Sequence, residues 1–545
     1  MASSGSFQGS EPASAGTVIG TIREISGGAA LCRFDHAALN EIASHGDETV
    51  ASSGAVGSQI KVKVGDCWLL GNVRNLRADP DLDAAILAEV DFLGEGNEAP
   101  DGTLTSFRRG VTRYPMPQTP VFTVSRADLD AVYAADERAH VEIGTVYPTN
   151  DVRGALFIDA MLGKHFALLG STGTGKSTSA ALILHRIVEQ NPEGHIVMLD
   201  PHGEYAAAFS SNGQIFNTDN LDLPYWLMNF EEHCEVLITT EGSEREQDMD
   251  ILAKCVLAAR SKSRVAQSLG KLTVDSPVPY LLSDLLAAIS AGMGKLDKAG
   301  DSAPYMRLKS KIEELKGDPR YGFMFNGLLV SDSMPEFLSK IFRLPAEGKP
   351  ISIIDLSGVP TDIVTVVVAV LSRLTFDYAI WSRREPQRPI LLVCEEAHRY
   401  VPSDRSSAPS AVRKVLESIA KEGRKYGVSL GLITQRPSDL AEGVLSQCGT
   451  IISMRLNNER DQMYVRNAMP EGARGFLDSI PALRNRECIV CGEGVNIPIR
   501  VRLDDLSAHL RPASDDPLFS ELWKETGGER EIIERTIHRW RGQGR

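Results

Sequence analysis

The chain has 545 residues, of which 42% are hydrophobic and 24% are charged, the composition of an ordinary soluble globular protein. This length predicts about two to four domains. The formal net charge of −14 argues against a uniformly basic nucleic-acid-binding protein, although it permits a local basic channel. The eight cysteines are scattered along the chain, which favours reduced thiols and a cytoplasmic location.

The amino terminus carries no recognisable secretory signal. Residues 1–16 lack both a charged start and an apolar core, so we expect a disordered leader. The longest strongly apolar run, Ile363–Leu371, is too short to cross a bilayer, and we expect no membrane attachment. Cys488 and Cys491 have the spacing of metal ligands, but no second pair accompanies them, and a metal is not expected there.

Residues 17–148 predict a small β-barrel. Short apolar or alternating stretches are separated by turns rich in Gly and Asp, which is typical of a barrel with short strands. The expected strands are residues 17–25, 59–64, 67–73, 85–93 and 120–124. This region contains no catalytic constellation, so we expect it to serve assembly or the docking of a partner.

From residue 149 onward, strands alternate with helices. This pattern predicts a mostly parallel sheet, and the fold class expected for the chain is therefore α/β. Residues 149–242 and 347–505 form the two parts of the expected core. Residues 243–346 have a helical pattern and predict an α-helical insertion, and residues 506–545 form a tail that ends in a basic helix.

A phosphate-binding loop follows the first strand of this core. Phe166–Leu169 is an apolar run that predicts a buried strand, and a helical pattern begins at Thr178. The glycines between them let backbone N–H groups wrap a polyphosphate, and the helix amino terminus adds a partial positive charge. The residues expected to bind ATP are Gly170, Ser171, Thr172, Gly173, Thr174, Gly175, Lys176, Ser177 and Thr178.

Catalytic side chains are expected at the ends of two further strands. Lys176 reaches the β and γ phosphates, and the Ser177 hydroxyl ligates Mg²⁺. Glu395 and Glu396 end the apolar strand that starts at Ile390. We expect Glu395 to hold Mg²⁺ and Glu396 to polarise the attacking water, although Glu at position 395 departs from the more usual Asp.

Gln435 and Arg424 complete the expected catalytic set. Gln435 ends the strand Val428–Gln435 and could bond the γ-phosphate or the water; otherwise it is a turn residue. Arg424 could act as an arginine finger supplied across a subunit boundary, or it could be a cation favoured by a helix carboxyl terminus. Lys164 is a weaker second basic candidate.

Two groups of basic residues are candidates for contacts with DNA phosphates. One lies at the start of the helical insertion and the other follows the acidic pair, and both could instead be solvated faces. The candidates are Arg260, Lys262, Arg405, Arg413 and Lys414. No aromatic residues are interleaved with them, which disfavours base stacking.

Five motifs in order resemble the HerA family of hexameric ATPases, which are related to the FtsK-like DNA pumps. The stretch Asp-Pro-His-Gly-Glu-Tyr at residues 200–205 carries most of this resemblance, because phosphate loops are widespread. The other motifs lie at residues 170–177, 392–398, 422–426 and 434–437, and the resemblance covers nearly the whole chain.

The resemblance implies an N-terminal barrel, a RecA-like core with a helical insertion, and a C-terminal brace. It implies a homo-hexameric ring that uses ATP and Mg²⁺ to translocate or unwind double-stranded DNA, with a NurA-like nuclease or another effector protein as partner, in DNA repair or antiviral defence. A regulatory scaffold that gates a bound effector enzyme is the alternative. A protein-export ATPase is less favoured, because nothing suggests docking to a membrane.

Overall fold

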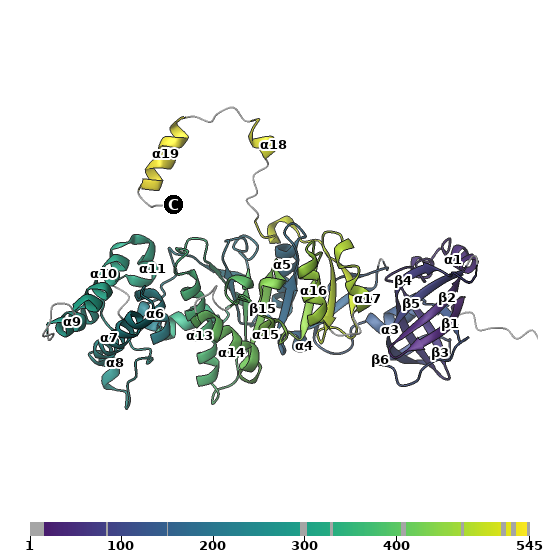
Figure 1. The fold of residues 1–545 in the computed structure, drawn as a ribbon, viewed down its shortest axis with the longest axis horizontal. Coiled ribbons are helices and arrows are strands. Elements are labelled where there is room, and N and C mark those ends of the chain that lie inside the picture. The colour runs from purple at the N-terminus through teal and green to yellow at the C-terminus, as the bar shows by residue number, and fades with distance from the viewer. Residues whose placement is uncertain are drawn as a thin grey trace, which may run out of the picture. The chain divides into compact units, whose positions relative to one another are not determined.

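The fold is described from a computed structural model, which covers residues 16–82, 85–149, 151–294, 302–326, 331–404, 410–469, 474–513, 519–524 and 530–541. The chain divides into two compact units (Figure 1). Unit 1 combines Met1–Ile187 with Ile433–Leu506, and unit 2 combines Val188–Leu432 with Ser507–Arg545. The expected leader, apart from Gly16, lies outside the described residues.

Unit 1 begins with a closed barrel, drawn in purple in Figure 1. The neighbouring strands run in the order β2-β1-β7-β3-β4-β5, and the ring closes because β2 also pairs with β5. The strands are β1 (Val18–Ser26), β2 (Ala29–Asp35), β3 (Gln59–Val64), β4 (Cys67–Ala78), β5 (Ala85–Glu98) and β7 (Pro120–Thr123). A further strand, β6 (Leu104–Arg109), pairs with β5 alone. The barrel predicted from the sequence is confirmed.

Helix α3 (Arg126–Tyr133) is held to the barrel by a buried ion pair. The Lys61 ammonium lies 2.8 Å from the Asp128 carboxylate, and both side chains are fully buried. Asp128 also accepts hydrogen bonds from the backbone N–H groups of Ser125 and Leu104, which offset the cost of burying its charge. The other helices of this region are α1 (His36–Ile42) and α2 (Glu48–Ala51).

The second part of unit 1 is a mixed sheet. Strands β10 (Phe166–Leu169) and β16 (Thr450–Ser453) are parallel. The sheet continues from β16 by antiparallel pairing through β17 (Glu487–Gly492), β18 (Ile499–Leu503), β8 (His140–Val146) and β9 (Arg153–Phe157). The expectation of a mostly parallel sheet does not hold for this part.

Strand β8 corrects the expected end of the barrel domain at residue 148. It pairs with β18, with Val146 opposite Val501, and makes no pair with a barrel strand. The helices of this part are α4 (Ile158–Leu162), α5 (Lys176–Gln190, which runs from unit 1 into unit 2), α15 (Glu442–Leu445), α16 (Glu459–Ala468) and α17 (Arg474–Leu477).

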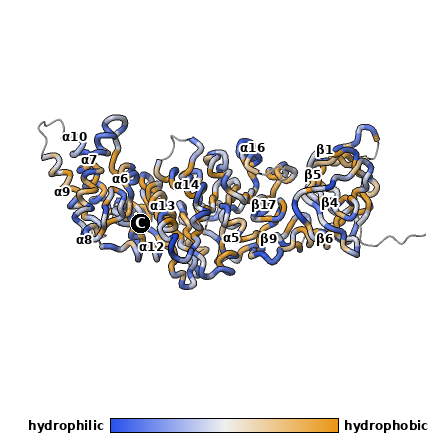
Figure 2. The backbone as a smooth tube through the Cα atoms, turned by 90° about the horizontal axis from the view of Figure 1, so that it is seen from below, coloured by the Kyte–Doolittle hydropathy of each residue, from blue (hydrophilic) through white to orange (hydrophobic). Residues whose placement is uncertain are grey.

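Unit 2 is built on five parallel strands, as the alternation of strands and helices predicted. Their order is β12-β13-β11-β14-β15. The strands are β11 (Ile196–Asp200), β12 (Gly213–Phe216), β13 (Ile351–Asp355), β14 (Ile390–Cys394) and β15 (Val428–Thr434), the last of which ends in unit 1. All residues of β11 and β14 are buried because parallel strands are covered on both faces, and Figure 2 colours the backbone by hydropathy, with hydrophobic residues in orange.

Helices make up the rest of unit 2. The predicted helical insertion is occupied by α7 (Gly242–Ser261), α8 (Arg264–Gln267), α9 (Leu282–Met293), α10 (Ala303–Gly317), α11 (Gly322–Phe325) and α12 (Met334–Phe342). The others are α6 (Phe230–Leu237), α13 (Val364–Trp381), α14 (Ser410–Tyr426), α18 (Phe519–Leu522) and α19 (Arg530–Arg541). The short 3₁₀ helices are η1 (Tyr225–Leu227), η3 (Pro319–Tyr321), η4 (Ala397–Arg399), η5 (Pro437–Asp439), η7 (Ile480–Ala482) and η8 (Ala508–Leu510).

Helix α13 extends well beyond the apolar run Ile363–Leu371. Within the described part of the chain, it is the one helix long and apolar enough to cross a membrane by composition. Of its residues, 67% are buried inside the structure, as in the core helix of a globular unit. It packs against α14 and lies next to it in Figure 1.

Candidate active site

The phosphate loop lies in unit 1 between β10 and α5. Gly173 and Gly175 have φ angles of 78° and 93°, which side chains with a Cβ rarely adopt. A Cβ at Gly170 would lie 2.9 Å from the Cβ of Met454, so this position also requires glycine. Helix α5 begins at Lys176, whose side chain is largely buried. The nine residues expected to bind ATP therefore form the turn before α5 and its first residues.

The segment that follows β16 holds this loop in place. The backbone N–H of Ser171 donates to the carbonyl of Arg455, 2.9 Å away, and the Ser171 hydroxyl accepts from the N–H of Asn457 at 3.1 Å. The Thr174 hydroxyl donates to the Ser171 carbonyl at 2.7 Å, which closes the turn on itself. These contacts shape the loop before any ligand binds.

Gln435 contacts the phosphate loop directly. It follows β15, and the carbonyl of Thr434 accepts from the N–H of Gly170 at 3.3 Å. The Thr172 hydroxyl donates to the side-chain oxygen of Gln435. Gln435 is therefore hydrogen-bonded to the phosphate loop.

The acidic pair lies in unit 2 at the carboxyl end of β14. Every residue of β14 is buried, and the side chains of Glu395 and Glu396 are almost completely buried as well. Glu396 has a left-handed backbone (φ 52°, ψ 43°), which costs a residue with a Cβ on the order of 1–3 kcal/mol. One carboxylate oxygen of Glu396 lies 3.2 Å from Nδ1 of His398.

The loop after β11 supports Glu395. The carboxylate of Asp200 accepts hydrogen bonds from the backbone N–H groups of His202, Gly203 and Tyr205, at 3.2, 2.9 and 2.9 Å. Burial raises the pKa of Asp200, and the backbone donors oppose that shift. The loop so formed directs the Tyr205 hydroxyl to a carboxylate oxygen of Glu395, 3.0 Å away.

Sequence reasoning assigned no role to Tyr205 or His398. Both lie in motifs that were recognised, and the available signal was the position of polar residues just after two strand ends, where α/β sheets place ligands.

Arg424 lies near the end of α14 and is exposed. Among the described residues, none forms an ion pair with its guanidinium. Because β14 and β15 are parallel and in register, Arg424, which lies in α14 four residues before β15, is at the opposite end of these strands from Glu396. Five residues of strand span roughly 15 Å, so Arg424 does not serve the acidic pair of its own unit.

The expectation that Arg260 contacts DNA is wrong. Its side chain is fully buried, and its guanidinium donates to the carbonyl groups of Trp226, Met228 and Val274. A group that holds three backbone carbonyls inside the protein cannot reach a phosphate. Desolvation lowers the pKa of Arg260 from its ordinary value.

The other DNA candidates are mostly ion-paired. Lys262 pairs with Asp284 at 3.0 Å, Lys414 with Glu231 at 2.5 Å, and the half-buried Arg413 with Glu417 at 2.8 Å. Arg405 lies outside the described residues. Lys164, the second basic candidate, pairs with Glu493.

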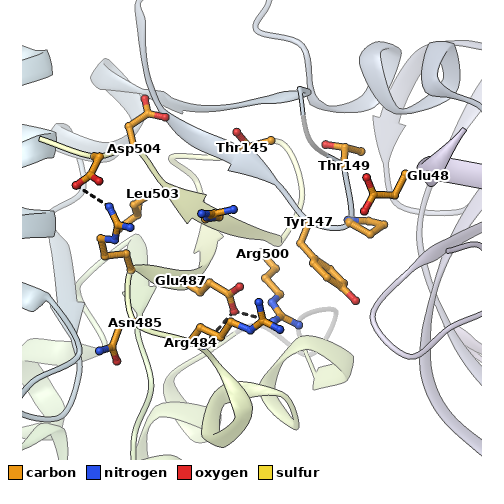
Figure 3. A pocket seen from close by; sticks show the side chains of 14 residues that line it. Glu48, Thr145, Tyr147, Thr149, Arg484, Asn485, Glu487, Arg500, Leu503 and Asp504 are labelled. Atoms are coloured by element: carbon orange, nitrogen blue, oxygen red, sulfur yellow. Dashed lines mark hydrogen bonds and ion pairs between the residues drawn. The ribbon is translucent and has the colours of Figure 1, made fainter.

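A polar cavity of about 640 Å³ opens in unit 1. Figure 3 shows Arg500 against the ring of Tyr147, with 4.2 Å between guanidinium and ring centre, and bonded to Glu487 at 2.7 Å. Arg486 lines the same cavity, and its backbone N–H donates to the Thr174 carbonyl of the phosphate loop at 3.1 Å. The cavity wall is therefore continuous with the loop.

Several known proteins are similar to this chain in sequence. Residues 141–375 match the family model described as the central domain of helicase HerA. The DNA double-strand break repair helicase HerA of Pyrococcus furiosus is 28% identical over 421 residues, which cover 70% of this chain and 72% of that protein. HerA of Sulfolobus acidocaldarius is 27% identical over 434 residues, 78% of this chain and 80% of that protein.

The fold agrees with a solved structure as well. VirB4 of Thermoanaerobacter pseudethanolicus aligns with a TM-score of 0.50 at 15% identity, over 69% of this chain and 99% of that chain. At this identity the likeness shows the fold alone, which is that of a phosphate-loop ATPase with a RecA-like core. The central part of this chain thus matches the HerA family model, and over most of its length the chain is similar to HerA helicases.

Proposed function

We propose that the chain is an ATP-driven translocase or helicase that acts on double-stranded DNA. The observation that carries this proposal is the contact between Thr172 of the phosphate loop and Gln435, because it joins the loop that would hold the γ-phosphate to a residue that would sense its loss. The two relatives are named DNA double-strand break repair helicases, which supports DNA as the substrate along which the protein moves and DNA repair as the process in which it acts.

In this proposal the phosphates lie along the backbone N–H groups of residues 170–178, and Lys176 neutralises their charge. The Ser177 hydroxyl and the Glu395 carboxylate would hold Mg²⁺, which would polarise the transferred phosphoryl group. A hydroxyl and a buried carboxylate are oxygen donors of the kind that Mg²⁺ prefers. Glu396 polarises the attacking water, and Gln435 reports the departure of the γ-phosphate.

Arg424 is supplied to the ATP of a neighbouring subunit. An unpaired guanidinium at the far end of the strands from its own acidic pair supports donation in trans. A closed ring gives every subunit one neighbour that donates and one that receives. A homo-hexamer is the assembly we propose.

The remaining parts serve partners and assembly. The barrel docks a NurA-like nuclease or another effector for DNA end processing or antiviral defence, residues 243–346 are the helical insertion, and residues 506–545 form a C-terminal brace. All eight cysteines are free thiols and all but Cys67 are buried, which supports a cytoplasmic protein.

The Lys176→Ala variant tests whether the phosphate loop is the site of DNA-stimulated ATP hydrolysis. The purified full chain is assayed for ATP hydrolysis with Mg²⁺, with and without linear double-stranded DNA. Turnover should rise with DNA in the parent protein and should fall on the order of 100-fold or more in the variant, because the charge that stabilises the phosphates is lost.

Lys316→Ala, an exposed lysine on α10, is the matched control and should keep parental turnover. Persistent hydrolysis in Lys176→Ala would overturn the phosphate-loop assignment. Turnover that DNA does not change in the parent protein would instead favour the scaffold that gates an effector enzyme.

A further inference from the structure

An exposed basic surface in unit 2, which we call the amino-end patch, consists of Trp381, Arg383, Arg384, Arg388 and Arg424. Trp381 is the last residue of α13, the next three arginines lie in the connection to β14, and Arg424 is near the end of α14. The N–H of Ile390 donates to the carbonyl of Gly427 at 2.9 Å, which brings the two connections together. The patch therefore lies at the amino ends of β14 and β15.

The arginines of this patch lack acidic partners. Within the described ranges, no carboxylate forms an ion pair with Arg383, Arg384, Arg388 or Arg424, and all four are exposed. Cations are favoured at the carboxyl ends of helices such as α13 and α14, which accounts for part of this charge. The helix dipole does not explain why the indole of Trp381, in the same patch, is exposed.

Trp381 is 85% exposed, the highest value for a large hydrophobic side chain in the described part of the chain. Its surroundings are ordered rather than loose. The Arg383 guanidinium lies 5.4 Å from the ring centre of Tyr426, which in turn packs edge-on against Phe376 at 5.7 Å. An exposed indole two residues away from a guanidinium that packs on an aromatic ring is the composition of an interface hot spot, because Trp and Arg dominate the energy of such surfaces.

We infer that the amino-end patch is a subunit interface whose partner is a second copy of this chain. This inference rests on the proposed function, in which Arg424 completes the ATP site of the neighbouring subunit. A copy that receives Arg424 must cover the surface around it, and that surface includes Trp381. Asp and Glu outnumber Lys and Arg by 72 to 58, so a second copy has carboxylates in excess that can face these arginines.

The amino-end patch makes two kinds of contact in this interface. Trp381 supplies apolar area that is covered on association, while Arg383, Arg384 and Arg388 select an acidic surface and fix the orientation. Arg424 then enters the neighbouring ATP site at a defined position. The same surface thus holds the subunits together and supplies Arg424 to the neighbouring ATP site.

Trp381→Ala and the triple variant Arg383→Ala/Arg384→Ala/Arg388→Ala test the inference. The mass distribution of the full chain is measured over a range of protein concentrations with ATP and Mg²⁺. Both variants should require about 10-fold or more protein to assemble, as expected for loss of hot-spot contacts. ATP turnover per chain should recover at high concentration, because the groups that act on ATP are intact.

Met306→Ala is the matched control, since Met306 is a large hydrophobic residue that is 53% exposed and lies on α10, outside the amino-end patch. It should assemble like the parent protein; an equal shift in this variant would overturn the inference. Unchanged assembly of both patch variants would also overturn it, and so would a loss of DNA affinity with assembly intact, which would make the patch a nucleic-acid surface. A parent protein that stays monomeric at every concentration would instead contradict the proposed ring.

Discussion

At the scale of single residues, Glu396 combines burial with a strained backbone. A left-handed conformation is rare for Glu and persists only where the surroundings impose it. Here the Glu396 carbonyl accepts the N–H of Arg399 at 2.9 Å, so the chain enters η4 directly after the strand. The strained backbone belongs to the residue whose buried carboxylate is proposed to polarise the attacking water, which supports the role proposed for Glu396.

Tyr205→Phe tests how Glu395 is held. The hydroxyl donates to a buried carboxylate oxygen, and its removal leaves that oxygen less satisfied at a cost of about 1–3 kcal/mol. We expect ATP turnover to fall about 10-fold. The Mg²⁺ concentration for half-maximal activity should rise, while ATP affinity stays near parental. Steady-state turnover over a Mg²⁺ titration, with nucleotide affinity measured separately, gives all three values.

Tyr321→Phe is the corresponding control, because its hydroxyl also donates to a carboxylate, Asp362, at 2.7 Å but far from β14 in sequence. This variant should keep the parental Mg²⁺ dependence. If Tyr205→Phe lowers turnover without any change in Mg²⁺ dependence, Tyr205 does not act through Glu395.

The sequence alone predicted the surroundings of some site residues but not of others. The phosphate loop is local, since one stretch of nine residues contains its glycines, its lysine and its helix start. The burial of Arg260 is not local. Its carbonyl acceptors at Trp226 and Met228 lie more than thirty residues upstream, and no pattern around Arg260 distinguishes it from an exposed cation.

At the scale of elements, α6 is tied to its surroundings through a buried histidine. Nδ1 of His233 lies 2.7 Å from the Asn229 carbonyl, and Nε2 lies 2.8 Å from the Tyr280 hydroxyl. This arrangement suits a neutral imidazole that donates to the carbonyl and accepts from the hydroxyl. Burial, reinforced by the nearby charges of Arg260 and Arg373, lowers the pKa of His233 to about 3.

The direction in which folding stability changes with pH follows from the protonation of His233 in the unfolded and in the folded protein. An unfolded histidine binds a proton below about pH 6.5, whereas folded His233 stays neutral down to about pH 3. Stability should therefore fall as the pH is lowered through 6.5 and should continue to fall toward 3. Between pH 7.5 and pH 5 we expect a loss of about 2 kcal/mol from this residue, measured by urea unfolding at each pH.

His233→Gln should reduce this pH dependence, whereas His36→Gln, which changes an exposed histidine, should not. The NMR signal of His233 in the parent protein offers an independent check and should show no titration between pH 7.5 and pH 5. A His233 signal that titrates near pH 6.5 would contradict the assignment of a neutral buried imidazole.

Local pattern predicted most strands but could not give their partners. Strand β8 alternates as a barrel strand does, yet it pairs with β18, whose residues follow it by more than 350 positions. A pairing over that distance depends on the whole sheet. The parallel strands of unit 2 were predicted better, because continuous apolar runs separated by helices are specific to such sheets.

At the scale of the whole molecule, the two ends of β14 and β15 carry different halves of the proposed chemistry. The carboxyl end of β14 presents the buried acidic pair, and the amino end of β15 is preceded by the unpaired Arg424. Because parallel strands fix these ends apart, one chain cannot join them. Activity should then belong to the assembly rather than to the single chain.

Mixing two inactive variants tests this division of the site. Arg424→Ala keeps Glu396 but lacks the arginine for its neighbour, and Glu396→Gln keeps the arginine but lacks the carboxylate. In rings formed at random from equal amounts, about one site in four joins an intact Glu396 to an intact Arg424. We therefore expect each variant alone to be nearly inactive and the mixture to recover roughly a quarter of parental ATP turnover.

Recovery in the mixture depends on chains of both kinds meeting in one assembly. A mixture with Lys176→Ala/Arg424→Ala in place of Arg424→Ala should recover nothing, because no chain then has both an intact Lys176 and an intact Glu396 for the donated arginine to act with. If the first mixture also stays inactive while both variants assemble, Arg424 does not act in trans. Since β14 and β15 hold it away from its own Glu396, it would then have no part in hydrolysis at all.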